Sequence, residues 1–285
     1  MTATQRTVVG AAATVRWQPT DGDGTAAEPD GAITVTAVRS DGTVVLPAGT
    51  AATGTDADER TVTIPAGELL TPDLITVTWA EAGVGARAVT TVEVVGAWWA
   101  SIAEIRASDA SLSVTDVYPA ATLARVRAET EDEFELALGE SWRPRLTVVT
   151  VTADGAVLDT GLTPLRAVRW ATTAAGTSID VSDVTVDADL GRARRTTGWP
   201  TGRLTIGVEH GHDAIPADLR RAFTWRCRTR ANLALTVPQW ATAIASGDQT
   251  FRLAAPSGRG GWITGDRDVD AVLTRIRDER RMVIL

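Results

Sequence analysis

Gly96-Ala97-Trp98-Trp99 is the stretch at which the sequence changes its pattern. Before it, residues 1–96 are rich in Thr, Val, Ala and Gly and show no helical period. After it, apolar residues recur at the three- and four-residue spacings of amphipathic helices. The sequence therefore predicts a multidomain α+β protein, with an all-β sandwich over residues 1–96 and a helical domain with a small β-element over residues 97–285.

Short β-prone runs separated by turn residues fill the N-terminal part. Asp41-Gly42 stands between two of these runs and is a strong hairpin signal. The number and spacing of the runs predict an immunoglobulin-like sandwich, although the Cys pair of antibody domains is absent. We expect Trp17 and Trp79 in its core. The expected strands lie within Thr7–Trp17, Ala32–Val38, Thr43–Leu46, Arg60–Ile64, Leu74–Trp79 and Ala86–Val95.

Three helices and four strands are expected in the C-terminal part. Pro119 and Pro216 suit the first positions of two helices, and Gly139 suits a helix end. Pro216–Leu235 has an apolar face that contains Cys227, which we interpret as a small buried hydrophobic residue. The helices are expected over Tyr118–Gly139, Pro216–Leu235 and Asp266–Arg281, and the strands over Leu146–Thr152, Leu165–Thr172, Val181–Val186 and Leu204–Glu209.

Two of these helices carry opposite charges on their polar faces. The first has Glu129, Glu131, Asp132, Glu133 and Glu135, and the second has Arg220, Arg221, Arg226, Arg228 and Arg230. These faces are either complementary surfaces of neighbouring subunits or two solvated faces on separate sides.

Composition limits the class of protein. All 28 basic residues are Arg, which indicates a genome of high GC content, as in actinobacteria and their viruses. Nearly all of the net charge of −8 lies in residues 1–96, which makes that part a poor ligand for DNA phosphates. No apolar run is long enough to span a bilayer, and the N-terminus lacks a secretory signal, so we expect folding in a cytoplasm.

Glu209-His210-Gly211-His212-Asp213 is the one local cluster with metal-ligand residue types. Two His residues at this spacing seldom converge on zinc without a third ligand. We interpret the cluster as a turn from a strand into a helix, with Asp213 helping to cap it. The glycine-rich stretches lack the residues of nucleotide-binding loops. We therefore expect no enzyme activity, no metal and no cofactor.

Segments of the C-terminal part resemble the head-to-tail adaptor proteins of tailed bacteriophages, in particular those of actinobacterial phages. In that pattern an acidic helix ends in a small residue and an aromatic-x-Pro-Arg strand start follows; a second signature joins a His-Gly turn to a Pro-Ala-Asp-Leu-Arg-Arg-Ala helix. The matching segments are Ala103–Ala107, Asp116–Leu123, Glu129–Gly139 with Trp142–Arg145, Val208–Ala222, Phe251–Leu253, Gly260–Trp262 and Val269–Leu273. The resemblance covers roughly residues 97–285, and the N-terminal sandwich is an extension.

The resemblance implies a structural virion protein in the phage neck, assembled in the host cytoplasm. It implies a ring of usually twelve copies that joins the portal protein to a downstream neck or tail-completion protein, while DNA passes through without specific binding. It makes the C-terminal segment the part that contacts the portal. The interface candidates are Trp262, Val269, Leu273, Ile276, Met282, Val283, Ile284 and Leu285, with Arg220, Arg221 and Arg228.

Several apolar residues leave alternatives open. Met282–Leu285 is an apolar chain end that is either tucked onto its own domain or docked on a partner subunit. Trp98-Trp99 is either a plug between domains or an interface anchor, and Trp199, Trp240 and Trp262 are further interface candidates. The rival functions are a virion-surface or soluble β-sandwich that binds carbohydrate or a cell-surface partner, and an enzyme whose site has no sequence signature.

Overall fold

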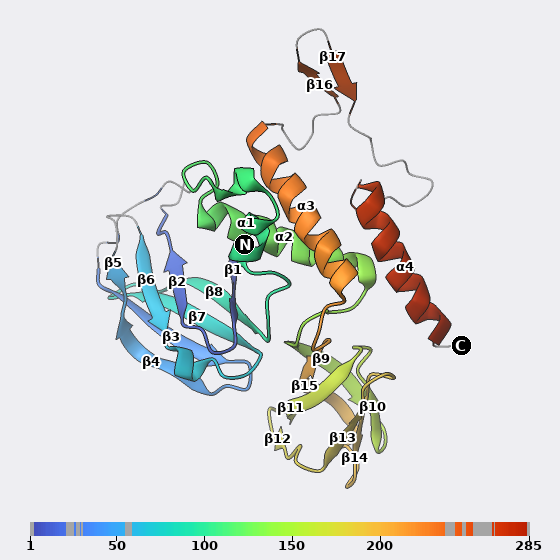
Figure 1. The fold of residues 1–285 in the computed structure, drawn as a ribbon. Coiled ribbons are helices and arrows are strands. Elements are labelled where there is room, and N and C mark those ends of the chain that lie inside the picture. Colours follow the sequence, from blue (N-terminus) through green and yellow to red (C-terminus); the bar gives the residue numbers. More distant parts are fainter. Residues whose placement is uncertain are drawn as a thin grey trace. The chain divides into compact units, whose positions relative to one another are not determined.

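The computed structural model describes residues 3–20, 26, 29, 31–54, 59–236, 243–246, 249–252, 264 and 266–283. The chain forms two compact units (Figure 1). The first contains residues 1–97 and 143–212, and the second contains residues 98–142 and 213–285. The chain therefore passes between the units three times. The expected α+β class with an N-terminal β-sandwich is confirmed.

The N-terminal sandwich consists of two sheets. One has the order β1-β8-β7-β3-β4, in which β1 runs parallel to β8, and the other has the order β2-β6-β5. The shared core contains residues of both sheets, such as Val15 and Ile64 from one and Val35 and Val77 from the other. The strands are β1 Ala3–Val8, β2 Ala13–Trp17, β3 Ile33–Arg39, β4 Val44–Ala51, β5 Thr53–Gly54, β6 Arg60–Ile64, β7 Asp73–Glu81 and β8 Gly85–Val95, with a 3-10 turn η1 at Ala66–Glu68.

The expected core residues and hairpin of the sandwich are present. Trp79 is fully buried in β7, and its ring centroid lies 5.7 Å from that of the partly buried Trp17. At the turn, Gly42 has a φ of 91°, which favours glycine, and the Asp41 carboxylate accepts the Thr43 N–H at 2.8 Å. The expected run Thr7–Trp17 is two strands, because the chain crosses from one sheet to the other between β1 and β2.

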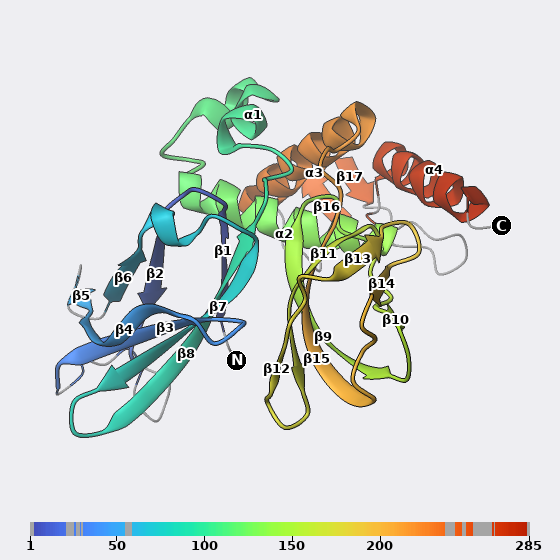
Figure 2. The same cartoon turned by 90° about the horizontal axis from the view of Figure 1, so that it is seen from below.

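The first unit contains a second β-body built from residues 143–212 (Figure 2). Its two sheets have the orders β12-β11-β15-β9 and β10-β14-β13, and both contribute to one core that includes Leu158, Ala193 and Ile206. The sequence predicted four strands here. The structure adds three short ones, so that the strands are β9 Arg145–Ala153, β10 Val157–Asp159, β11 Leu165–Thr173, β12 Ser178–Ile179, β13 Val184–Asp187, β14 Arg192–Arg195 and β15 Gly202–His210.

The second unit is mainly helical. Its core centres on Trp99, Phe134 and Phe223, whose ring centroids are 5.3–5.6 Å apart. No helix among the described residues is long and apolar enough to cross a membrane. The elements are α1 Ile102–Ala107, η2 Ala110–Ser113, α2 Ala120–Leu138, α3 Ala217–Thr236, α4 Arg267–Val283 and the two-stranded hairpin β16 Ala243–Ser246 with β17 Gln249–Arg252.

The helix ends follow the sequence signals closely. Pro119 is the N-cap of α2, and Gly139 is its C-cap with a φ of 74°. The α3 helix begins at Ala217, directly after Pro216. The buried faces of α2, α3 and α4 carry the residues expected from the helical period, including Leu123, Phe223 and Leu273.

The division of the chain is not linear, unlike the expected domains of residues 1–96 and 97–285. The helical unit begins at Trp98, but the strands of residues 143–212 belong to the same unit as the sandwich. The two parts share no sheet among the described residues. They are joined by contacts between distant segments, such as the hydrogen bond from Gly96 to Pro144 and the ion pair of Glu93 with Arg145, and a local pattern does not contain that information.

Candidate functional site

The three chain segments that leave the first unit start from one place. Gly96 donates its N–H to the carbonyl of Pro144 at 2.7 Å, and Arg145 is the cross-strand partner of His210 at the end of β9 and β15. A Cβ on Gly96 would lie 2.8 Å from the Pro144 ring, so this close approach needs glycine. We call this region the connection corner, consisting of Arg6, Glu93, Gly96, Arg143, Pro144, Arg145 and His210.

A buried carboxylate organises the charges of the connection corner. Glu93, 2% exposed on β8, forms an ion pair with Arg6 from β1 at 2.7 Å and with Arg145 from β9 at 2.5 Å. Burial by itself raises the pKa of Glu93, but Arg145, Arg6 and Arg143 outweigh it and hold the pKa below its usual value. The carboxylate is thus ionised and joins β1, β8 and β9.

His210 and Glu209 are the sequence cluster that had metal-ligand residue types. Burial and the charge of Arg145 lower the pKa of His210 to about 4, so its ring is neutral at pH 7. Its Nε2 lies 2.8 Å from the Thr147 hydroxyl. Glu209 lies in two ion pairs, with Arg166 at 2.9 Å and with Arg169.

The Glu209–Asp213 cluster is therefore a turn with structural ion pairs. Gly211 has a φ of 107° and donates its N–H to the Pro164 carbonyl at 2.9 Å, which reverses the chain after β15. Among the described residues no group of three or more His, Cys, Asp or Glu side chains is arranged to hold a metal ion. Cys227 is buried in the helical core, and burial raises the pKa of its thiol to about 12.

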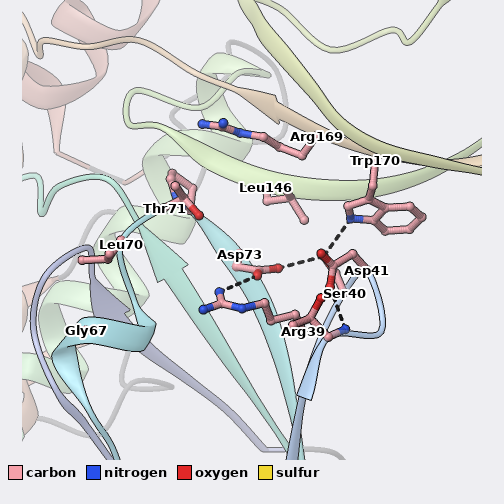
Figure 3. A pocket seen from close by; sticks show the side chains of 12 residues that line it. Arg39, Ser40, Asp41, Gly67, Leu70, Thr71, Asp73, Leu146, Arg169 and Trp170 are labelled. Carbon is pink, nitrogen blue, oxygen red and sulfur yellow. Dashed lines mark hydrogen bonds and ion pairs between the residues drawn. The ribbon is translucent and has the colours of Figure 1, made fainter. Parts of the chain in front are cut away.

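An open pocket of about 300 Å³ lies between the sandwich and the second β-body of the first unit (Figure 3). The Trp170 indole N–H donates to the Ser40 hydroxyl at 3.0 Å, and that hydroxyl donates to Asp73 at 2.7 Å. Arg39 also donates to Asp73, at 3.1 Å. This network links β3, β7 and β11, so its polar groups hold the two β-bodies of the unit together.

The charged faces of α2 and α3 meet inside the helical unit. Arg226 forms two hydrogen bonds to Glu133, at 3.0 and 2.9 Å, and Arg228 forms an ion pair with Asp109 at 2.6 Å. Glu131 is fully buried and accepts the Trp99 N–H at 3.3 Å. The expectation of a wholly outer acidic face is thus wrong, because part of it pairs with α3 and part is buried.

Several of the predicted interface residues are buried within the chain itself. Val269, Leu273 and Ile276 lie in the core of the helical unit, 0–6% exposed, because they form the inner face of α4. Trp199 is also buried, in the second β-body, and donates to the Ala193 carbonyl at 3.3 Å. These side chains contact their own chain and do not form an exposed surface.

The other candidates are exposed or undescribed. Arg220 and Arg221 are exposed on α3, and Arg228 is partly exposed. Trp240, Trp262, Ile284 and Leu285 lie outside the described residues, as do the side chains of Met282 and Val283, whose backbone ends α4. Trp99 is in the helical core, while the ring of Trp98 stacks under the Arg127 guanidinium at 3.5 Å.

Comparisons with known proteins give no family. No family model matches the sequence, and no curated protein matches it. A solved chain in the neck of an empty GTA particle is a weak structural match, with 18% identity and a TM-score of 0.36 over 51% of this chain and 83% of that chain.

Two further solved structures match at lower TM-scores. A chain of the ZIG-8–RIG-5 IG1–IG1 heterodimer is 12% identical, with a TM-score of 0.22 over 33% of this chain and 82% of that chain. The SGBP-B protein of the Bacteroides ovatus mixed-linkage glucan utilization locus, in complex with a mixed-linkage heptasaccharide, is 12% identical, with a TM-score of 0.20 over 74% of this chain and 50% of that chain. At these TM-scores the likenesses carry no argument about function.

Sequence reasoning missed most of the connection corner. Glu93 lies in a β-prone run and Arg6 lies directly before one, and neither side chain has a local signal of burial. Arg143 and Arg145 belong to the aromatic-x-Pro-Arg pattern, which does not show what these side chains pair with. The charge of Glu93 is the signal that the sequence offers. A carboxylate within the apolar run Thr91–Val95 needs a buried cation as its partner if that strand is central in a sheet.

Proposed function

We propose that this protein is a structural, non-catalytic subunit of the neck of a phage-like particle. The observation that carries the proposal is the position of the two segments that resemble adaptor proteins. Trp142–Arg145 leads from α2 into β9, and Val208–Ala222 leads from β15 into α3. Arg145 and His210, one from each segment, are cross-strand partners. Two resemblances far apart in the sequence thus occupy one structural feature.

The connection corner suits a subunit that transmits force between a head and a tail. Its ion pairs, among them Glu93 with Arg6 and Arg145, lie where the chain leaves the first unit. A buried network of ion pairs restricts the geometry of the strands that it joins. A loop with exposed charges would leave these segments less constrained.

The finer part of the proposal is a closed ring, usually of twelve copies, between the portal and a downstream neck protein. A ring with cyclic symmetry needs two different complementary surfaces on each subunit. Exposed Arg220 and Arg221 on α3 remain candidates for one of them. The net charge of −8 suits a lumen through which DNA passes without being held.

Electron microscopy of the purified full chain and of particles tests this function. We expect closed rings from the protein alone and density for the protein at the neck. Deletion of the gene for this protein should leave heads and tails unjoined. Absence of the protein from particles, or normally joined particles after the deletion, would contradict the proposal.

The carbohydrate-binding alternative has one observation in its favour, the open pocket with Trp170 in its lining (Figure 3). A glycan array with the full chain and with Trp170→Ala tests it. Binding that the variant loses would favour this alternative, and no binding by the full chain would reject it.

A further inference from the structure

The β9 strand forms one edge of its sheet. It is the last strand in the order β12-β11-β15-β9, and its nine residues pair with β15 in an unbroken register. From Leu146 to Ala153 it contains no charged residue, glycine or proline. The unpaired N–H and C=O groups of such an edge are a template for another strand.

Two other edges in the first unit have features that block pairing. The β4 edge contains Pro47 and Gly49, and its register with β3 is irregular. The β12 edge has only two residues. Proteins commonly protect exposed edges by such means, so the regular and uncharged β9 edge indicates a strand that is covered in the assembled state.

The helical unit carries a β-hairpin without a sheet. β16 and β17 pair with each other, and among the described residues with no other strand. An isolated two-stranded hairpin is marginally stable in water and gains stability by joining a further strand.

We propose that the β16–β17 hairpin of one copy adds to the β9 edge of a second copy and extends its sheet. Each copy then has one donor and one acceptor, which are different surfaces. Contacts of this kind repeat from subunit to subunit and close a ring when the rotation permits. The inference rests on the proposed ring function and deepens it by naming the contact between neighbours.

A charge on the β9 edge tests the contact. Thr150 is exposed on β9, and Thr150→Lys should raise the apparent dissociation constant of self-association at least tenfold, measured by sedimentation of the full chain. Thr76→Lys is the matched control, because Thr76 is exposed on β7 but already has Val38 and Thr91 as partners on either side. Equal association of both variants and the wild type would overturn the inference.

Disulfide trapping tests which chain supplies the hairpin. Thr150→Cys and Thr250→Cys are prepared separately, mixed and oxidised with a copper–phenanthroline catalyst. We expect a disulfide-linked dimer only in the mixture. The buried Cys227 serves as an internal unreactive thiol. Failure to cross-link in the mixture would overturn pairing between copies.

Electron microscopy of the Thr150→Lys variant separates this inference from the proposed function. If the wild type forms rings and the variant does not, both the β9 contact and the proposed ring function are supported. Rings that persist in the variant overturn the β9 contact and leave the ring function intact. Cross-linking of the Thr150→Cys and Thr250→Cys variants, combined with a wild type that never forms rings, supports the contact and counts against the function.

Discussion

Glu93 stands at the centre of the connection corner, and its charge is compensated by Arg residues from two other strands. Removing one member of a buried ion pair leaves the other uncompensated in a medium of low polarity. Glu93→Gln should therefore lower the free energy of unfolding by about 3–5 kcal/mol, measured by urea denaturation. Glu59→Gln is the control, because Glu59 pairs with the exposed Arg16 and should cost less than about 1 kcal/mol. Equal losses in the free energy of unfolding for the two variants would mean that the ion pairs of the connection corner contribute no more stability than an exposed ion pair.

His210 should make the stability of the first unit depend on pH. Its pKa is about 4 in the folded protein, below the usual 6.5, so the unfolded chain binds more protons between these values. The free energy of unfolding should fall as pH decreases from about 7 to 4, by at most about 3 kcal/mol for this group. The lowered pKa of Glu93 adds a further loss below its usual value of 4.5.

Unfolding curves at several pH values check this dependence. His210→Gln keeps a polar group near the Thr147 hydroxyl but cannot take up a proton in this range. Its stability should change less between pH 7 and pH 4 than that of the wild type. An identical pH dependence in the two proteins would assign the effect to other groups.

At the scale of elements, Gly207 shows how two strands of the second β-body fit together. Gly207 lies on β15 beside Trp170 of β11, and a Cβ at this position would lie 2.2 Å from the indole Nε1. Gly207→Ala must displace the indole, which also donates to Ser40. We expect a loss of about 1–3 kcal/mol in the free energy of unfolding, as for other overpacked cores.

Two further variants check the cause of this loss. Gly155→Ala is the matched control, since its added Cβ meets no atom within 4 Å and should change stability little. Trp170→Leu should make Gly207→Ala cost less, and the difference measures the coupling between the two sites. If the changes in the free energy of unfolding from Gly207→Ala and Trp170→Leu simply add, the indole is not what the new Cβ collides with.

The elements themselves were largely predictable, and their pairing was not. β6 spans Arg60–Ile64 as expected, since its alternation is local, and α2 lies between Pro119 and Gly139 because both residues act on the adjacent turn. The short β14 was missed because three of its four residues are Arg and only Ala193 is buried. The close approach of Gly207 and Trp170 depends on register, which no local window contains.

At the scale of the whole molecule, most of the interface residues predicted from the sequence lie in the helical unit. The predictions on α4 assumed that its apolar face meets another subunit, and the structure places that face in the helical core. Those on the Arg-rich face of α3 are partly met by Glu133 and Asp109 of the same unit. The sequence identified the apolar face of α4 and the Arg-rich face of α3, but the partners of their buried and paired residues within the helical unit are visible only in the three-dimensional arrangement.

Leu273 distinguishes these two roles of α4. It is fully buried in the helical core, so Leu273→Ala should lower the stability of the helical unit by about 2–5 kcal/mol. Hydrogen exchange should become faster across α2, α3 and α4, while the strands of the first unit keep their protection, because the units have separate cores. Leu136→Ala on α2 is the matched control, since Leu136 is 86% exposed and its truncation should leave exchange unchanged. Unchanged helical exchange in Leu273→Ala, combined with weaker self-association, would instead restore α4 as an interface between subunits.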